Sequence, residues 1–429
     1  MFHRRGSVKR ISISKLCYVL AIGGTIFVFL QLYLDLIERK SAGYSAYRRI
    51  IRKEAISEDS EGDLLNVNDE LLIETRNTIA SYSKPMIPIE EVVAAIILCE
   101  ADETKPYKGS ISSFEQHIDR AKSLLKSIVF LSQQHIKGDE LVCRHRLHVL
   151  VNSNEVIRGI TSVVEFWPPQ QRNKIALKFR KVSSQSTLGV EEKTRVTCVS
   201  KKLIFEKMYP EEDALIYLDT DIVFLRPIED LWRVFKNFND EQLFGAVTPL
   251  WRIFNDKPFT EFEKMVNFAG RGFNAGLLLL NLTRIRSQAE KWQAALQSAL
   301  EVVAFNEQSL FNLMMNLNPE HFYEMDCEWN FRLGLCTNVT HRCPGLVANG
   351  VHAVHGNGGA FFKDRNVVLK ILHEYWRDLD MSKSLNNVIS ELNAILPDAV
   401  LKTPPCDLVE GLHEMLMKHM KLLDGKLDN

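Results

Sequence analysis

Two aspartates form the strongest chemical signal in this chain. Asp219 and Asp221 lie between two apolar runs, at 215–218 and 222–225. Side chains at positions i and i+2 of an extended chain point to the same side. Two neighbouring carboxylates repel each other unless a cation joins them, and oxygen ligands suit Mg²⁺ or Mn²⁺. The pair therefore indicates a divalent-cation site at the end of a buried strand, with two solvated loop aspartates as the simpler alternative.

A histidine in the C-terminal third of the chain is a second candidate ligand. His355 ends the short apolar run 351–354 and is followed by three glycines at 356, 358 and 359. Neutral imidazole binds Mn²⁺, and glycines let backbone N–H groups approach a phosphate. A turn with a structural histidine would explain the same residues. More than 130 residues separate His355 from Asp219, so only the fold can bring the two together.

Two other segments place polar groups at the expected ends of elements. Asn274 and Gly276 precede the apolar run 277–280, which indicates either a turn that contacts a sugar or an ordinary start of a strand. Asn306, Glu307 and Gln308 stand where a helical pattern begins. Capping of that helix would explain their presence without any further role.

Apolar runs alternate with helical patterns along the chain. This alternation predicts an α/β domain with a mostly parallel sheet, and such sheets bind ligands beyond the carboxyl ends of their strands. We expect strands at 92–98, 147–151, 163–167, 214–218, 243–247, 276–280 and 351–354. We expect helices at 112–133, where Ser112 can provide the cap, and at 196–208, 228–238, 287–302 and 308–316.

The N-terminus contains a long apolar segment. Residues 16–34 carry no charge and would span about 28 Å as a helix, close to the thickness of a bilayer core. Basic residues precede the segment, so we expect residues 1–15 to be a cytoplasmic tail, residues 16–37 a transmembrane signal anchor, and the rest to be lumenal. A cleaved signal peptide or a buried helix are the alternatives, but residues 31–37 offer no small-residue cleavage site.

The remaining sequence divides into three parts. Residues 38–90 are polar and indicate a stem, with a helical stretch near 70–79. Residues 91–383 form the expected catalytic domain, and residues 384–429 a helical C-terminal extension. The net charge of −1 on 429 residues provides no field that would attract nucleic acid.

Lumenal exposure would give meaning to the sequons and the cysteines. Asn281 and Asn338 each begin an Asn-x-Thr sequon. In an oxidising compartment some of the seven cysteines beyond the anchor should pair, and an odd number leaves at least one over. For the group Cys327, Cys336 and Cys343 we expect disulfides, with zinc as the alternative, since no Cys-x-x-Cys pair is present. The seven are Cys99, Cys143, Cys198, Cys327, Cys336, Cys343 and Cys406.

The polar segments, in this order, resemble glycosyltransferase family 8 over roughly residues 90–380. The matching stretches are 217–227 with 230–232, 274–284, 327–332 and 355–357. The Cys-x-Trp-Asn segment and its trailing cysteines are similar to those of the glucoside xylosyltransferases, which add xylose from UDP-xylose to O-linked glucose on EGF-like repeats such as those of Notch. The resemblance implies the Rossmann-like nucleotide-sugar transferase fold called GT-A.

The resemblance also implies roles for individual residues. Asp219, Asp221 and His355 would bind the metal, Mn²⁺ or Mg²⁺. Glu307 would bind sugar hydroxyls and Gln308 would lie under the anomeric carbon, although the family commonly has Gly-Asp-Gln-Asp where this chain has Asn306-Glu-Gln-Ser309. Gly358 stands where a related arginine occurs. The residues implied to bind the nucleotide sugar are Lys202, Asp219, Thr220, Asn274, Gly276, Gly356 and Lys363.

The implied activity is that of a retaining UDP-xylose:O-glucoside α-1,3-xylosyltransferase in the Golgi or ER membrane. Its partners would be a UDP-sugar and a glycoprotein acceptor carrying O-glucose on EGF-like repeats. A family-8 transferase that uses another UDP-hexose is the nearest alternative. A catalytically inactive lumenal binding protein with the same fold is another, and a hydrolase is disfavoured because no Gly-x-Ser-x-Gly nucleophile motif is present.

Overall fold

A computed structural model of the chain describes residues 72–74, 91–99, 114–132, 145–182, 198–248, 272–302 and 307–425. The expected tail, the anchor and all but three residues of the expected stem lie outside these ranges. Within the ranges, none of the helices combines the length and apolar character needed to cross a bilayer.

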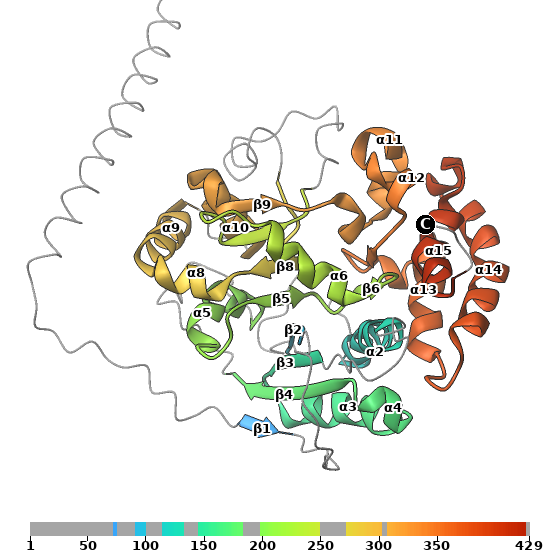
Figure 1. Ribbon diagram of the computed structural model, residues 1–429, viewed down its shortest axis with the longest axis horizontal. Helices are drawn as coiled ribbons and strands as arrows, with labels where there is room; N and C mark the ends of the chain where they lie inside the picture. The colour runs from blue at the N-terminus through green and yellow to red at the C-terminus, as the bar shows by residue number, and fades with distance from the viewer. Residues whose placement is uncertain are drawn as a thin grey trace, which may run out of the picture. The chain divides into compact units, whose positions relative to one another are not determined.

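An eight-stranded sheet forms the centre of the fold, in the order β1-β4-β3-β2-β5-β8-β7-β9 (Figure 1). Strands β4, β3, β2 and β5 run parallel, as do β7 and β9, whereas β1–β4, β5–β8 and β7–β8 are antiparallel. The mostly parallel α/β sheet is therefore confirmed. The strands are β1 Leu72–Glu74, β2 Val93–Leu98, β3 His145–Val151, β4 Ile175–Lys181, β5 Leu215–Leu218, β7 Phe244–Ala246, β8 Leu277–Leu280 and β9 Phe322–Glu324.

Helices cover both faces of this sheet, which explains why its central strands are continuous apolar runs. Along β2, Ala94 and Ile96 face one core, while Ala95 and Ile97 face the other. The first core contains α2 Phe114–Leu131, α3 Asn154–Glu165, α13 Val367–Asp378, α14 Leu385–Leu401 and α15 Leu412–Leu423. The second contains α5 Phe205–Met208, α8 Leu282–Ser287, α9 Ala289–Val302 and α10 Glu307–Leu317.

A separate two-stranded ribbon lies beside the sheet and carries part of the site. Strand β6 Ile222–Phe224 pairs antiparallel with β10 Ala353–His355. The other short helices are α4 Pro169–Arg172, α6 Ile228–Trp232, α11 Val339–Arg342 and α12 Gly345–Asn349. Short 3₁₀ segments span Cys198–Ile204, Arg233–Asn237, Pro319–His321, Cys327–Asn330, Leu333–Asn338, Ala360–Phe362 and Cys406–Leu408.

Two predicted elements are wrong. Residues 163–167 are not a strand, because Val163 and Val164 belong to the buried face of α3 together with Val156 and Ile160. Ser153 caps this helix by accepting a hydrogen bond from the Val156 N–H at 3.3 Å, and the helical spacing of the apolar residues decides its structure. The predicted helical stretch near 70–79 instead contains β1, which forms the edge of the sheet and pairs with β4.

Two predicted helices are only partly α-helical. The segment 196–208 is a 3₁₀ turn at Cys198–Ile204 followed by the short α5. The segment 228–238 begins as α6 and continues as 3₁₀. The ends of the predicted helix 112–133, including Ser112, lie outside the described residues.

The C-terminal helices belong to the first core. Helix α14 packs against both α13 and α15, and α13 itself packs on α2 (Figure 1). Leu392, Leu396 and Met420 are fully buried there. The hydroxyl of Thr403 accepts a hydrogen bond from the Val368 N–H at 2.9 Å. Residues 385–423 are thus part of the same hydrophobic core as the sheet.

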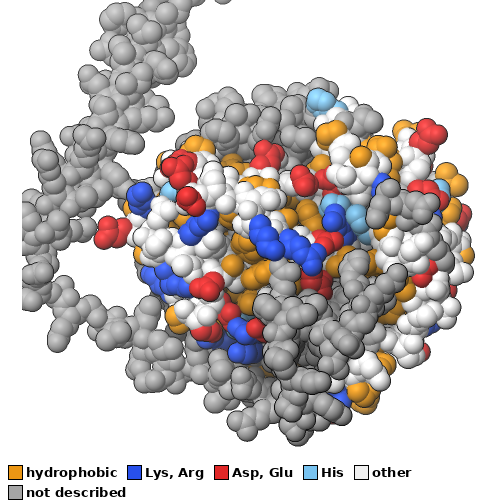
Figure 2. All heavy atoms as spheres, viewed as in Figure 1, with side chains coloured by type: hydrophobic (Ala, Val, Ile, Leu, Met, Phe, Trp, Pro, Cys, Tyr) orange, Lys and Arg blue, Asp and Glu red, His pale blue; other side chains and the backbone are white. Residues whose placement is uncertain are grey.

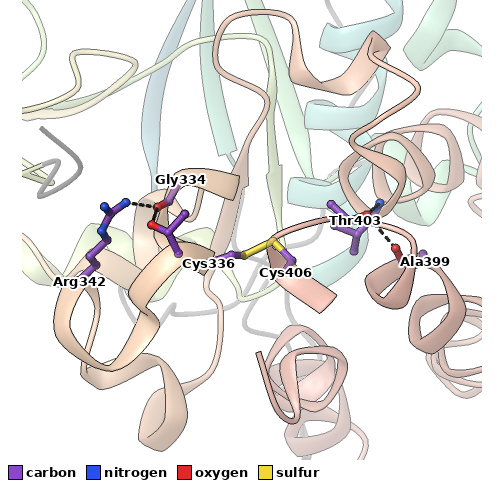
Figure 3. Close-up of a disulfide and its surroundings, with 8 residues drawn as sticks. Gly334, Cys336, Arg342, Ala399, Thr403 and Cys406 are labelled. Atoms are coloured by element: carbon purple, nitrogen blue, oxygen red, sulfur yellow. Dashed lines mark hydrogen bonds between the residues drawn. A yellow bond between two sulfur atoms is a disulfide. The ribbon is translucent and has the colours of Figure 1, made fainter. Parts of the chain in front are cut away.

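The described cysteines form three disulfides: Cys99–Cys198, Cys327–Cys343 and Cys336–Cys406. The Cys336–Cys406 bond joins the segment after β9 to the turn between α14 and α15 (Figure 3). The expectation of disulfides over zinc in the 327–343 segment is confirmed. Cys143 lies outside the described residues.

Candidate active site

The two aspartates lie in the turn that connects strand β5 of the sheet to strand β6 of the ribbon. Asp219 follows β5, and its N–H donates to the Gly276 carbonyl at 2.6 Å. The Tyr217 hydroxyl donates to Asp219 Oδ1 at 2.6 Å. Asp221 directly precedes β6 and is buried. The turn between the two strands therefore keeps both carboxylates at the carboxyl end of β5, as the sequence predicted.

Strand pairing brings His355 to this turn. His355 lies opposite Ile222 in the β10–β6 pair, and the next N–H, of Gly356, donates to the Asp221 carbonyl at 2.7 Å. His355 Nε2 is 3.3 Å from Asp221 Oδ1 and 3.9 Å from Asp219 Oδ2. The fold thus joins the three predicted ligands across more than 130 residues.

The three side chains fit a divalent cation. Their ligand atoms all lie within 4.8 Å of one another, and two carboxylates with one imidazole are a donor set that suits Mn²⁺. Gly276 leaves the space for the cluster, because a Cβ atom there would lie 2.5 Å from Asp219 Oδ2 and 2.5 Å from His355 Cε1. A residue with a side chain at 276 would therefore collide with two of the ligands.

Burial affects the two carboxylates differently. It raises the pKa of Asp219 above its usual value, and the charge of Asp221 adds to the rise against the opposing charge of Lys202. Burial alone would also raise the pKa of Asp221, but the charge and hydrogen bond of His355 lower it below its usual value. A cation between the two carboxylates would favour the charged form of both.

A chain of side-chain hydrogen bonds supports the cluster. Asn330 Oδ1 lies 3.0 Å from His355 Nδ1, and Asn330 Nδ2 donates to Asn274 Oδ1 at 3.2 Å. Asn274 Oδ1 also accepts the N–H of Gly276 at 3.0 Å. The sequence showed Asn330 within the Cys-x-Trp-Asn segment but assigned it no role. The bridge between Phe331 and Val354 that places it beside His355 is a long-range contact.

The start of α10 faces the same turn. The Gln308 Oε1 atom accepts hydrogen bonds from Asn274 Nδ2 at 3.3 Å and from the Ala275 N–H at 3.4 Å. Gln308 is exposed, whereas Asn274 is buried. The side chain that the resemblance places under the anomeric carbon is therefore held at the mouth of the site. Asn306 lies outside the described residues.

Lys202 connects this turn to Glu307. Its side chain is almost fully buried, and its Nζ donates to the Ala275 carbonyl at 2.9 Å. The same Nζ lies 3.4 Å from Glu307 Oε1 and 4.4 Å from the centre of the Tyr217 ring. Lys202 thus pairs with Glu307 and is close enough to Asp219 for its charge to oppose the rise in the pKa of that carboxyl. Thr220, between the two aspartates, is buried.

A glycine-rich turn directly follows His355. A Cβ atom at Gly356 would lie 2.7 Å from the Phe361 ring, so only glycine fits there. Gly358 has a φ of 67° and Gly359 a φ of 72°, which favours glycine. Lys363 is exposed and donates from Nζ to the Gly358 carbonyl at 2.7 Å. Lys363 lines a cavity together with His355. Figure 2 shows basic side chains beside acidic and histidine side chains near the middle of one face of the molecule.

Another group of potential ligands has a different explanation. His148, Glu211 and Glu212 also lie close together. Arg146 Nη1 donates to both carboxylate oxygens of Glu212, at 2.7 and 2.8 Å, and His148 Nε2 lies 2.8 Å from Glu212 Oε1. Arg146 already neutralises this carboxylate through one nitrogen that contacts both of its oxygens, so the group is an ion-pair network.

Comparisons with known proteins identify the family of the chain. The model of glycosyl transferase family 8 matches residues 122–360, more than half of the chain. Glucoside xylosyltransferase 2 of Xenopus laevis is 28% identical over 282 residues, which cover 62% of this chain and 64% of the relative. Glucoside xylosyltransferase 1 of Danio rerio is 26% identical over 310 residues, covering 69% and 73%. The chain thus spans less than two thirds of the length of the Xenopus relative.

Among solved structures, mouse xyloside xylosyltransferase 1 has a TM-score of 0.47 and 18% sequence identity, covering 62% of this chain and 98% of that one. The predicted resemblance to family 8, and within it to the glucoside xylosyltransferases, is confirmed by the family match and by the sequence relatives. The family match, together with the α/β sheet described above, supports the expected GT-A-like fold. This chain belongs to glycosyl transferase family 8.

Proposed function

We propose that the protein is a retaining, metal-dependent xylosyltransferase that moves xylose from UDP-xylose to an O-linked glucose, as on EGF-like repeats, forming an α-1,3 linkage. The observation that carries the proposal is the cluster of Asp219, Asp221 and His355 at the carboxyl end of β5. The choice of xylose rests on the glucoside xylosyltransferases among the relatives.

The residues in and around the cluster would have different roles in the reaction. Asp219, Asp221 and His355 would hold Mn²⁺ or Mg²⁺, which acts as a Lewis acid toward the diphosphate. Glu307, which pairs with Lys202, accepts hydrogen bonds from sugar hydroxyls, while Gln308 places its amide at the anomeric carbon. Each charge-assisted bond to Glu307 contributes about 1.5–3 kcal/mol.

The covalent step exchanges one bond for another at the anomeric carbon. The acceptor hydroxyl oxygen bonds to this carbon, and the bond from the carbon to the diphosphate oxygen breaks with its electron pair on that oxygen. The hydroxyl proton passes to the departing diphosphate oxygen. Because an amide such as that of Gln308 is a poor nucleophile, we favour attack on the same face as the leaving group, through an oxocarbenium-like state, over a covalent sugar–enzyme intermediate.

A panel of UDP-sugars tests the proposed donor. Calorimetry with UDP-xylose, UDP-glucose and UDP-galactose, each with Mn²⁺, should give the highest affinity for UDP-xylose. Preference for a hexose donor would point to another family-8 activity. Absence of binding for every donor would support the inactive, lumenal binding protein, although the complete ligand set of the cluster argues against it.

We also propose that the catalytic domain lies in the lumen of the Golgi or ER, behind the anchor at 16–37. The basic residues before the apolar segment support this orientation. Asn338 is exposed, whereas the Asn281 side chain caps α8 by accepting the Arg284 N–H. Glycosidase treatment should therefore change the electrophoretic mobility of the cellular protein, and Asn338→Gln should remove most of that change. An unglycosylated Asn338 would count against lumenal placement.

A further inference from the structure

Arg332 is a buried arginine for which the described residues provide no partner. Only 8% of the residue is exposed. Its Nε is buried without a hydrogen-bond acceptor, and no described hydrogen bond or ion pair involves its guanidinium. Burial lowers the pKa of Arg332 to about 10, with no nearby carboxylate to oppose the shift. A buried charge without a counter-ion is costly, so its retention indicates a ligand that supplies the opposite charge.

The position of Arg332 is set by the same strand contact that supports the metal cluster. Phe331 pairs in parallel with Val354, and the Phe331 carbonyl accepts the N–H of His355 at 2.8 Å. Arg332 is the next residue and continues in an extended conformation, with φ −138° and ψ 153°. Its backbone therefore runs beside His355.

Arg332 and His355 line one cavity of about 260 Å³. The polar side chains along its wall are basic or neutral, and no carboxylate is among the described residues that line it. Those polar residues are Arg332, His355, Asn357, Lys363, Arg365 and Asn366. The chemistry of this wall suits an anion.

The size of the cavity indicates which part of a donor it would hold. Pockets for complete small-molecule ligands have volumes of about 300–1,000 Å³, so this cavity suits a fragment of a nucleotide sugar. The fragment that lies at a metal cluster and carries negative charge is the diphosphate. The open glycine turn at 358–359, where an added Cβ would meet nothing within 4 Å, leaves room for it.

We propose that Arg332 binds the diphosphate of the nucleotide-sugar donor and neutralises the charge that this group gains as it departs. The inference rests on the proposed function and adds a cation from the segment after Cys327–Asn330. Cleavage of the bond to the anomeric carbon leaves an electron pair on the diphosphate oxygen, and the guanidinium donates hydrogen bonds to that anion. Arg332 thus complements Lys363, whose side chain lies exposed at the rim.

Binding measurements on Arg332→Met test this role. UDP and inorganic pyrophosphate, each with Mn²⁺, should bind about ten- to a hundred-fold more weakly than to the wild-type protein, since a hydrogen bond to a charged group is lost. UMP should bind equally well to both proteins. The melting temperature of the ligand-free variant should equal or exceed that of the wild type, because an unpaired buried charge has been removed.

Two other variants complete the test. Arg332→Lys keeps the charge and should bind UDP with intermediate affinity. Arg233→Met removes one positive charge from an exposed site, where Arg233 pairs with Asp230 at 2.5 Å, and should bind all three ligands as the wild type does. If Arg332→Lys binds UDP like the wild type and Arg332→Met fails to fold, Arg332 has a structural role and the inference is overturned.

The remaining outcomes separate this inference from the proposed function. Unchanged UDP affinity in Arg332→Met, or equal losses for UDP and UMP, overturns the role of Arg332 while the donor assignment stands. A wild-type protein that binds pyrophosphate but not UDP, with weaker pyrophosphate binding in Arg332→Met, keeps the anion site and overturns the donor. Binding of neither ligand overturns both.

Discussion

Asn330 and His355 share a buried hydrogen bond, with 3.0 Å between Asn330 Oδ1 and His355 Nδ1. Because Oδ1 is an acceptor, this contact favours the tautomer in which Nδ1 carries the proton and Nε2 is free to bind a metal. Nε2 is the atom that points toward Asp221. A residue outside the predicted ligand set therefore orients one of the ligands.

Replacement of Asn330 should weaken the metal site. We expect Asn330→Ala to lower Mn²⁺ affinity by roughly ten- to a hundred-fold, the usual effect of losing an outer partner of a metal ligand. Electron paramagnetic resonance titration of Mn²⁺ provides the measurement. Asn349→Ala is the control, since Asn349 bonds to Glu328 away from the cluster and should leave Mn²⁺ affinity unchanged. Equal affinities for Asn330→Ala and wild type would contradict the orienting role.

A methyl group at position 276 should block the site sterically. The Cβ of Gly276→Ala would lie 2.5 Å from Asp219 Oδ2 and from His355 Cε1, so we expect Mn²⁺ and UDP-sugar binding to be lost. Gly245→Ala is the matched control on strand β7, where the new Cβ would lie 2.9 Å from the Phe238 ring. That variant should lower the melting temperature and leave metal affinity intact. Normal Mn²⁺ binding by Gly276→Ala would rule out the proposed ligand geometry.

Glu307 should affect the choice of donor sugar. Its carboxylate is 3.4 Å from the Lys202 ammonium and is one methylene longer than the usual aspartate. Xylose lacks the hydroxymethyl group of glucose, so a tight pocket must exclude added volume. We expect Glu307→Ala to weaken UDP-xylose binding by roughly ten-fold or more. Glu307→Asp should reduce the preference for UDP-xylose over UDP-glucose.

The alternative for Glu307 is a purely structural role at the start of α10. In that case Glu307→Ala would lower the melting temperature and leave the ratio of the two donor affinities unchanged. Equal affinity of the wild-type protein for UDP-xylose and UDP-glucose would remove the xylose assignment and leave the family assignment.

Acid should weaken the network around Glu212. Burial raises the pKa of Glu212, but the hydrogen bonds of His148 and Arg146 outweigh it and lower the pKa to about 2. A carboxyl with a depressed pKa stabilises the fold above its unfolded pKa of about 4.3 and loses that contribution as the pH falls toward 2. The difference in unfolding free energy between wild type and Glu212→Gln should therefore be largest near neutral pH and shrink below pH 5. A difference that stays constant from pH 7 to pH 3 would refute this.

The sequence predicted those parts of the fold and site where a local pattern of apolar and polar residues is enough to identify a strand and its carboxyl end. The continuous apolar run 92–98 is a central strand covered on both faces. Asp219 and Asp221 lie at the end of such a strand, where parallel sheets bind ligands. The position of His355 beside them came from the family resemblance, and the β10–β6 pairing explains it.

Local pattern was insufficient where periodicity was ambiguous or contacts were distant. The apolar residues at 163–167 fit a short strand, but Ile160 one turn earlier and Val156 two turns earlier make Val163 and Val164 part of the buried face of a helix. Asn330 and Arg332 lie in the family-like stretch 327–332, but that stretch does not show what their side chains contact, because their placement beside His355 arises from the pairing of Phe331 with Val354. No spacing rule relates these two segments in advance.

Calorimetric titration of UDP-xylose into wild-type and Asp221→Asn proteins, with and without Mn²⁺, tests the metal-dependent donor site most directly. Asp221 Oδ1 lies 3.3 Å from His355 Nε2, and its charge is needed to hold a cation at the diphosphate. We predict Mn²⁺-dependent binding to the wild type and none to Asp221→Asn, with similar melting temperatures for the two ligand-free proteins. Mn²⁺-dependent binding of normal affinity by Asp221→Asn would contradict the assignment of the site.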